Sequence, residues 1–425
     1  MTATLPTPPA PRVEVLDRTD SEAYLTTRAL LDFGVDSAGW NPGNLTQVRE
    51  SASALRTLLD PQEIERPLGH GLLAYDHGKA TFRVMDPTTG AFGEPMTMTR
   101  TALRQMASRV LPGRGLSFVE ALRKMDDAGR KLAEINWTKF LQKQTDAALV
   151  RTIKLPGEPL RSVRAVLSQR YAIVDNLDVL DALMNNPDAA QLPVISVKIT
   201  DDAMRVRLAL DPSLLPEEAL RIGNEMNRAG GFLAKSSEIY AKLLEGPIAM
   251  LEVWNSEVGK AAVNARIGTF KLACLNGMTG WGGDNSSWRW FHSGGAGSSD
   301  RISNGIGEAL TTARVIGAGM VEAQKAAANV AIDDAFALLE RWADKSLTKD
   351  QLARTQEAML HPTSGPRNSL GSVVEGLTLA AQSESDLLAQ RDMEAFAGSF
   401  LRKGFAAASD GFIRNQREEI EIPEA

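Results

Sequence analysis

The chain has 425 residues, of which 43% are hydrophobic and 24% are charged, and its net charge is -6 with one cysteine. This composition is ordinary for a globular chain with room for about two or three domains, and it excludes an internal disulfide. No apolar run approaches the roughly 20 residues that a membrane-spanning helix needs. We therefore expect a cytoplasmic protein with no membrane partner and a buried, unreactive thiol at Cys274.

The N-terminal third begins with a stretch for which no structure is predicted. Residues 1–20 are rich in proline and lack an apolar core, which indicates a disordered start and neither a signal peptide nor an anchor. Short helical patterns follow, and residues 69–99 alternate around two turn sequences, as in a small antiparallel meander. Residues 101–110 and 117–132 are expected to be helices. We group residues 21–140 as an N-terminal α/β-meander region.

Three pairs of strands are predicted in residues 141–345, which we take as the core domain. The first pair flanks the turn sequence at residues 155–159, and the second alternates around residues 200–202. The third pair occupies residues 252–276 and is interrupted by Gly268, which indicates a bulge or a close approach of another backbone. If its second strand reaches a sheet edge, another copy of the chain could pair with it, so we expect a homo-oligomer.

The C-terminal part is predicted to be helical. One long helix should run from about Gly305 to Trp342, and residues 346–425 carry further helical patterns, the first opened by the capping-box sequence Thr348-Lys349-Asp350-Gln351. Together, these elements favour an α+β fold class. The sheet should be antiparallel and hairpin-rich, packed on the long helix, with a C-terminal helical region beside it.

Two polar turns are predicted around the third pair of strands. Asn255, Ser256 and Gly259 are residue types that end a strand and permit a tight turn, and Asn276-Gly277 is a hairpin-turn signal. Glu257, inside the first turn, is a weak candidate for a catalytic base or a metal ligand. Hydrogen bonding within the turn explains such a cluster more often than catalysis does.

Motifs that carry a recognised chemistry are missing from the sequence. It has no phosphate-binding loop of the Walker type, no complete dinucleotide fingerprint, no serine-hydrolase elbow, no paired Cys-x-x-Cys and no His-Glu-x-x-His. Four histidines and one cysteine are also few parts for a metal centre. We therefore expect no cofactor, no metal and, more plausibly than not, no catalysis.

Basic residues are concentrated in one part of the chain. The segment from Arg100 to Arg170 holds 15 Lys and Arg against 6 Asp and Glu, so it carries a surplus of nine positive charges and leaves -15 for the remainder. Such asymmetry predicts one basic surface on an acidic body, as in a protein that binds nucleic acid. The alternative is that these side chains lie on separate solvated helix faces.

A glycine-rich stretch from Thr279 to Asp300 carries several aromatic residues. Trp288, Arg289 and Trp290 alternate there, close to Trp281. Aromatic rings interleaved with arginine are typical of proteins that stack on single-stranded bases, where each stack contributes about 1–3 kcal/mol. The alternative, equally weighted, is that the indole rings are buried against the long helix.

Two segments resemble a known family. Residues 163–183 contain a strand that ends in Ser168, Arg170 and Tyr171, and residues 255–278 contain Asn-Ser-Glu-x-Gly followed by a strand ending in Cys-x-Asn-Gly-Met. Both look like signatures of the phage/plasmid-like protein family, domain of unknown function nine-three-two. The resemblance covers roughly residues 145–345. That family is similar to phage single-strand annealing proteins of the Rad-fifty-two type, which form rings and bind single-stranded DNA.

The resemblance implies a single-stranded nucleic-acid binding protein, with a possible strand-annealing role, from a phage or other mobile element in a bacterial host cell. The residues expected to contact nucleic acid are Arg164, Arg170, Tyr171, Arg266, Lys271, Trp288, Arg289 and Trp290. Two alternatives stay open. One is an enzyme that processes nucleic acid or nucleotides through Glu257, and the other is a structural, assembly or anti-defence protein without catalysis.

Overall fold

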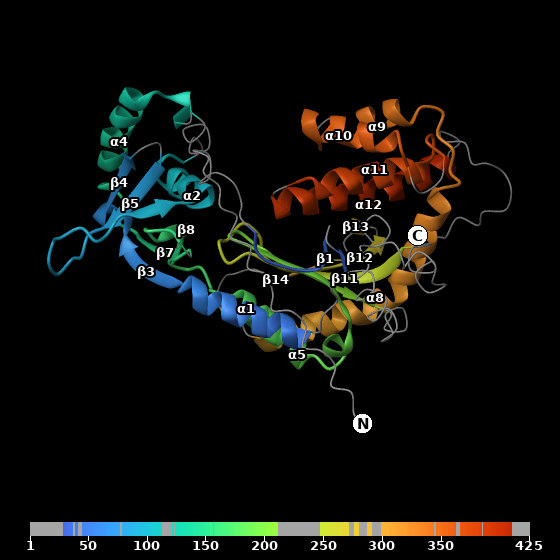
Figure 1. Cartoon of the computed structure of the whole chain (residues 1–425), viewed down its shortest axis with the longest axis horizontal. Helices are drawn as coiled ribbons and strands as arrows, with labels where there is room; N and C mark the ends of the chain where they lie inside the picture. The colour runs from blue at the N-terminus through green and yellow to red at the C-terminus, as the bar shows by residue number, and fades with distance from the viewer. Residues whose placement is uncertain are drawn as a thin grey trace.

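The computed structural model describes most of the chain between residues 29 and 409. The described residues are 29–36, 39–40, 45–76, 79–112, 121–122, 124–155, 157–210, 247–271, 276–279, 287–290, 299–343, 346–362, 366–384 and 386–409. They form two sheets that stand side by side, with C-terminal helices over one of them (Figure 1). The predicted α+β fold class is confirmed.

The six-stranded sheet has the strand order β3-β7-β8-β6-β5-β4. Its strands are β3 (Gln62–Pro67), β4 (Gly71–Asp76), β5 (Lys79–Val84), β6 (Met96–Met98), β7 (Ala147–Ile153) and β8 (Ser162–Ser168). Neighbouring strands are antiparallel except β6 and β8, which run parallel. The sheet therefore contains the predicted meander, β4 to β6, and the first predicted hairpin, β7 and β8.

Helices α2 (Arg100–Val110) and α4 (Asp127–Leu141) pack against this sheet, and the short helix η2 (Leu68–His70) precedes β4. The side chain of Thr99 caps α2 by accepting a hydrogen bond from the Ala102 amide, which satisfies one of the free donors of the first turn. Phe82, Met106 and Trp137 from the sheet and the two helices meet in one buried cluster. This cluster is the hydrophobic core of the six-stranded half of the molecule, which lies on the left in Figure 1.

The eight-stranded sheet has the order β13-β12-β11-β10-β9-β1-β2, and β14 also pairs with β12. Its strands are β1 (Ala29–Asp36), β2 (Gly39–Trp40), β9 (Val194–Thr200), β10 (Met204–Ala209), β11 (Ile248–Asn255), β12 (Val263–Lys271), β13 (Asn276–Thr279) and β14 (Ser287–Trp290). All pairs are antiparallel. Strand β12 has partners on both sides, so it offers no free edge to a second copy and the homo-oligomer stays a prediction without that support.

One face of the eight-stranded sheet packs on helices α1 (Leu45–Leu59), α5 (Asn176–Asn185) and the long helix α8 (Ser299–Ala327), with the short helix η3 (Ala189–Gln191) after α5 (Figure 1). Alternate residues of the strands point to this face because side chains alternate along a strand. They are apolar and form the largest core cluster, for example Val197, Val206, Val253 and Ile267.

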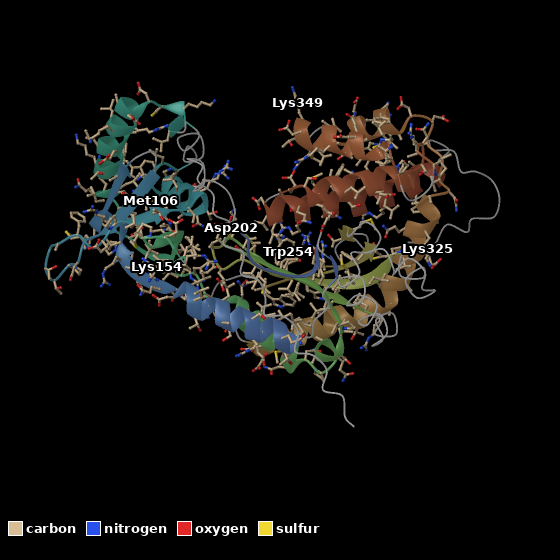
Figure 2. All side chains as sticks on the ribbon, in the orientation of Figure 1. Met106, Lys154, Asp202, Trp254, Lys325 and Lys349 are labelled. Carbon is tan, nitrogen blue, oxygen red and sulfur yellow. The ribbon has the colours of Figure 1, made fainter. Side chains whose placement is uncertain are left out.

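The opposite face of the same sheet is polar and is covered by helices α11 (Leu370–Gln382) and α12 (Leu387–Ser409). Helices α9 (Ala335–Ala343) and α10 (Lys349–Met359) lie on the side of α11 and α12 away from the sheet (Figure 1). The expected capping box at Thr348 and Gln351 opens α10. Figure 2 shows Trp254 on the sheet face that lies toward α12, and its ring is buried beside Leu387. The sheet is therefore enclosed between two layers of helices.

The single helix expected from Gly305 to Trp342 is wrong, because the chain breaks between α8 and α9. Val330 accepts a backbone hydrogen bond from Leu370 at 2.8 Å, and Ile332 donates one to Asn368 at 2.9 Å, so this segment pairs with an extended piece before α11. The side chain of Asp334 then accepts from the Ala337 amide and opens α9. The continuous helical pattern in the sequence did not indicate that a separate helix, α9, begins after Asp334.

The expected domain boundary near residue 140 does not separate the two sheets. Strands β7 and β8 follow it but belong to the six-stranded sheet, and β1 precedes it but pairs with β9. The close backbone approach expected at Gly268 is confirmed, since a Cβ atom there would lie 2.3 Å from the carbonyl oxygen of Met278. The predictions for residues 1–20, Cys274, Trp281 and the acidic tail after residue 418 lie outside the described residues.

Candidate nucleic-acid interface

The predicted turn after β11 exists, and we call residues 255–260 the polar turn. The Gly259 amide donates a hydrogen bond to the Ser256 carbonyl at 3.1 Å, and Gly259 has a positive φ of 73° that other residues adopt only with strain. A Cβ atom on Gly259 would lie 2.8 Å from the side chain of Leu167. The backbone at Ser256 and Gly259 therefore forms the tight turn that these residue types predict.

The polar turn connects the two halves of the molecule through buried hydrogen bonds. The Asn255 amide group donates to the Val174 carbonyl and to the Asn176 side chain, each at 3.0 Å. The Ser256 hydroxyl donates to the Asp202 carbonyl at 2.7 Å, at the tight turn between β9 and β10. Figure 2 shows Asp202 at the junction between the two sheets. The turn thereby fixes the start of α5 against the sheet.

Glu257 serves this same junction. One of its carboxylate oxygens accepts the backbone amide of Asn176 at 2.7 Å, and the other accepts Nη1 of Arg164 at 2.9 Å. Its carbonyl oxygen accepts Nη1 of Arg151 at 2.8 Å. Both carboxylate oxygens are therefore occupied in holding a helix start and an arginine. Among the described residues, no group of three or more His, Cys, Asp or Glu side chains could hold a metal ion.

The first of the two family-like segments supplies one exposed residue and two that are enclosed. Arg164 is 5% exposed and also donates from Nε to the Asp201 carbonyl. The Tyr171 hydroxyl donates to the Ser256 carbonyl at 3.0 Å, and burial raises the pKa of this phenol above its ordinary value. Arg170 is exposed. Arg164 and Tyr171 therefore brace the polar turn instead of facing solvent as a nucleic-acid contact would.

The basic segment from residue 100 to 170 does not form the uniform surface that its charge predicts. Three of its arginines pair with carboxylates that lie outside the segment: Arg151 with Glu63 and Asp175, Arg161 with Asp60, and Arg164 with Glu257. Pairing of β3 with β7 places Glu63 opposite Arg151, and the start of α5 and the polar turn supply Asp175 and Glu257. The surplus of positive charge in the sequence is thus partly neutralised in space.

The register of β12 and β14 decides the placement of the expected arginine and tryptophan contacts. Asn264 lies opposite Arg289, and Ala265 lies opposite Trp288. Because opposed residues of an antiparallel pair point to the same face, Arg266 and Arg289 share the polar face while the two tryptophans of β14 share the other. This corrects the expectation that the three residues from 288 to 290 form one mixed binding surface.

Both tryptophans pack on the apolar side. Trp288 and Trp290 are half-buried and lie against the core cluster beneath α8. The Trp290 ring fits so closely over Gly305 that a Cβ atom there would lie 2.0 Å from it. Their alternative role in packing, which the sequence had left open, accounts for this arrangement.

Arg266 is half-buried at the polar face and hydrogen-bonds Asn264 at 3.1 Å. Within the described part of the chain, no carboxylate lies within ion-pairing distance of its guanidinium. Burial lowers the pKa of Arg266, Arg391 of α12 and Arg289 lower it further, and Glu252 and Asp392 oppose them only in part. We call Arg266, Arg289 and Arg391 the arginine cluster.

Arg391 holds its place in this cluster by contacts on two sides. Its guanidinium lies 5.6 Å from the centre of the Trp254 ring, a cation–π distance, and it pairs with Asp392 at 2.7 Å. No local sequence pattern marks Arg391, which sits on a helix more than 100 residues after β14. Only the packing of α12 on the sheet brings it to Arg266.

Three further predicted residues lie where the far end of β12 pairs with β13. Lys271 is its last residue, with Asn276 opposite in the backbone register, and Gly277 lies opposite Phe270. Asn276 and Gly277 therefore belong to strand β13, and their expected role as the turn is wrong. The connection between the two strands falls at residues 272–275, which the structure does not describe.

Comparisons with protein-family models, with curated proteins and with solved structures found no match. The resemblance to the phage/plasmid-like family accordingly stays a prediction. Among the helices within the described ranges, none is long and apolar enough to cross a membrane.

Proposed function

We propose that this chain binds single-stranded nucleic acid through the arginine cluster. The observation that supports the proposal is Arg266, a half-buried cation with no ion-pair partner among the described residues and with two other arginines close enough to depress its pKa. Asp392 pairs with Arg391, but the pKa of Arg266 is still lowered, so the repulsion among the three guanidinium groups is only partly offset within the described residues. Phosphate oxygens accept charge-assisted hydrogen bonds from guanidinium groups, so a phosphodiester backbone would relieve the repulsion.

The proposed contact is mainly with phosphates. The two tryptophans of β14 face the core, so base stacking by them is not part of the proposal. The arginines lie on the polar face together with Asn264, and contacts of this kind position a strand without reading its sequence. We therefore expect weak sequence preference. The family resemblance points in the same direction.

A carboxylate-based enzyme has less support. Glu257, the residue on which that alternative depends, accepts two hydrogen bonds through its carboxylate and closes a structural junction. These two hydrogen bonds hold the carboxylate against Arg164 and the start of α5, which gives it a structural task. We infer that Glu257→Gln would affect the junction first.

The test is a fluorescence-anisotropy titration of a labelled oligothymidine of about 20 nucleotides at several salt concentrations. Three phosphate contacts on a single strand predict a slope of roughly -2 in a plot of log K against log salt, because each contact contributes about -0.7. Affinity should therefore fall roughly 20-fold between 50 and 200 mM salt. The variant Arg266→Gln with Arg289→Gln should reduce the slope to roughly -0.7.

Arg314→Gln is the matched control. Arg314 is exposed on α8 and pairs with Asp188 at 3.4 Å, away from the arginine cluster. The Arg314→Gln substitution removes one positive charge and leaves the proposed contacts unchanged. A double variant that binds like this control, or a parent protein whose binding does not respond to salt, would reject the arginine cluster as the interface.

A further inference from the structure

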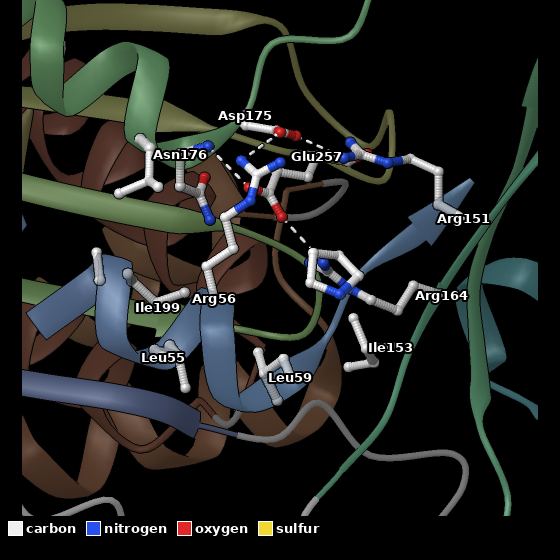
Figure 3. A pocket seen from close by; sticks show the side chains of 13 residues that line it. Leu55, Arg56, Leu59, Arg151, Ile153, Arg164, Asp175, Asn176, Ile199 and Glu257 are labelled. Carbon is white, nitrogen blue, oxygen red and sulfur yellow. Dashed lines mark hydrogen bonds and ion pairs between the residues drawn. The ribbon is translucent and has the colours of Figure 1, made fainter.

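A pocket lies where the two sheets meet, and the space between its lining atoms is about 470 Å³ with open solvent included (Figure 3). It is bounded by α1, strands β7 and β8, the start of α5 and the polar turn, and it opens to solvent. Its lining includes Leu55, Arg56, Arg151, Arg164, Asp175 and Glu257. Clefts at the junction of two structural units are common ligand sites.

One side of the pocket is apolar. Leu55 and Leu59 come from one face of α1, and Ile153 and Ile199 come from the two different sheets. All four side chains are buried, and Figure 3 shows them together on one side of the pocket. This side would remove an apolar group of a ligand from water.

The other side carries arginines that are already held in place. Arg164 uses Nε for the Asp201 carbonyl and Nη1 for Glu257, each at 2.9 Å, and its Nη2 has no acceptor among the described residues. Arg56 uses Nη1 for Asp175 at 2.6 Å and is 45% exposed. The other guanidinium nitrogens of Arg56 have no hydrogen-bond acceptor within the described part of the chain. Donors that protein contacts orient in advance lose little freedom when a ligand binds.

The charges of the lining determine the class of ligand. Three arginines and two carboxylates line the pocket, and Glu63 pairs with Arg151 at 3.1 Å from outside the lining. The guanidinium donors left for a ligand are therefore those of Arg56 and Arg164. A phosphate monoester carries more than one negative charge near neutral pH and would also face Asp175 and Glu257, so a singly charged carboxylate fits better.

We propose that this pocket binds a small carboxylate with an apolar body, the carboxylate at Arg56 and Arg164 and the apolar body against Leu55, Leu59 and Ile153. Planar guanidinium and carboxylate groups match in geometry, which favours this pairing over a single-point contact. The proposal does not depend on nucleic-acid binding, because the arginine cluster shares no residue with the pocket.

The test uses 3-phenylpropionate as the carboxylate probe and its neutral amide as the isosteric comparison. Ligand-observed NMR titrations of the full chain should give a Kd of about 1 mM or less for the carboxylate. The amide should bind at least about tenfold more weakly because it lacks the charge that the arginines require. Phenyl phosphate should bind more weakly than the carboxylate.

Arg56→Gln should weaken carboxylate binding about tenfold, since it removes one of the two guanidinium contacts. Arg49→Gln is the matched control: Arg49 lies on the same helix, is 39% exposed and pairs with Asp181 of α5 at 2.8 Å, but does not line the pocket. Thermal melting of both variants confirms folding. No binding of the carboxylate at about 10 mM, equal binding of the amide or the phosphate, or equal loss in both variants would overturn the proposal.

Discussion

Removal of Arg207 should destabilise the contact between the eight-stranded sheet and α12 more than removal of any exposed charge. Arg207 is 2% exposed and donates to Glu252 at 2.8 Å and to Glu394 of α12, both of which are 0% exposed. Arg205 lies 3.7 Å from Glu394, so two arginines and two glutamates balance one another. Glu394 and Glu252 hold the pKa of Arg207 above its ordinary value despite burial, which is consistent with a strongly stabilised cation.

The substitution Arg207→Met keeps much of the side-chain volume and removes the charge together with the hydrogen bonds to Glu252 and Glu394. Each ion pair at a charge separation of about 4 Å contributes about 4 kcal/mol at an effective dielectric constant near 20. Desolvation of the arginine, which costs several kcal/mol, offsets part of that sum. Two carboxylates would remain buried, with only Arg205 of the described residues at ion-pairing distance, and such broken pairs cost about 3–5 kcal/mol. We expect the free energy of unfolding to fall by an amount within that range at pH 7.

The pH dependence of this loss has a definite sign. Without Arg207, burial and mutual repulsion should raise the folded-state pKa of Glu252 and Glu394 above the unfolded value of about 4.3. Groups with a raised folded-state pKa bind protons on folding, so the variant should regain stability as the pH falls from 7 toward 5. The difference in unfolding free energy between parent and variant should therefore shrink over this interval.

Urea unfolding followed by tryptophan fluorescence measures both effects, because Trp254 lies within the same network and donates to Glu252 at 2.6 Å. Arg314→Met is the control, since its exposed pair with Asp188 should contribute less than about 1 kcal/mol. A loss below about 1 kcal/mol for Arg207→Met at pH 7, or a deficit that grows as the pH falls, would refute the reasoning.

Two further predictions concern the polar turn and the junction beside it. Gly259→Ala should lower the free energy of unfolding more than Gly157→Ala does. Both glycines have a positive φ, 73° and 78°, but only at Gly259 would the new Cβ atom also press against Leu167. Thermal melting compares the two variants, and equal losses would contradict the packing argument. Burial alone would raise the pKa of Asp175, but Arg151 and Arg56 outweigh it and the pKa lies below its ordinary value. Its contribution should therefore be present above about pH 4 and lost as the pH falls through the folded-state pKa, so Asp175→Asn should flatten the acid-unfolding curve.

Features that depend on a few adjacent residues could be predicted from the sequence. The turn at Gly259, the close approach at Gly268 and the capping box at Thr348 all follow from local backbone chemistry, and the structure confirms each of them. The alternation around residues 200–202 likewise gave β9 and β10. In each case the physical cause lies within one turn or one pair of strands.

Features that depend on distant pairing could not be predicted in this way. The carboxylates that neutralise Arg151 come from 88 residues before it and 24 residues after it, and no spacing rule joins them. The segment of Trp288 and Trp290 is a different case. Its period of two was visible in the sequence, but the surrounding glycines indicated a loop, so the separation of arginine and tryptophan onto opposite faces was not recognised.

The position of α12 links the proposed interface to the stability of the fold. Arg391 and Glu394 are three residues apart on this helix, so they lie on the same face, one beside Arg266 and the other on Arg207. A change in the buried ion pairs of Arg207 with Glu252 and Glu394 should therefore displace the guanidinium of Arg391, which belongs to the arginine cluster. If nucleic acid binds there, Arg207→Met should weaken binding although Arg207 is itself enclosed, whereas unchanged affinity in a destabilised variant would show that Arg391 takes no part in the contact.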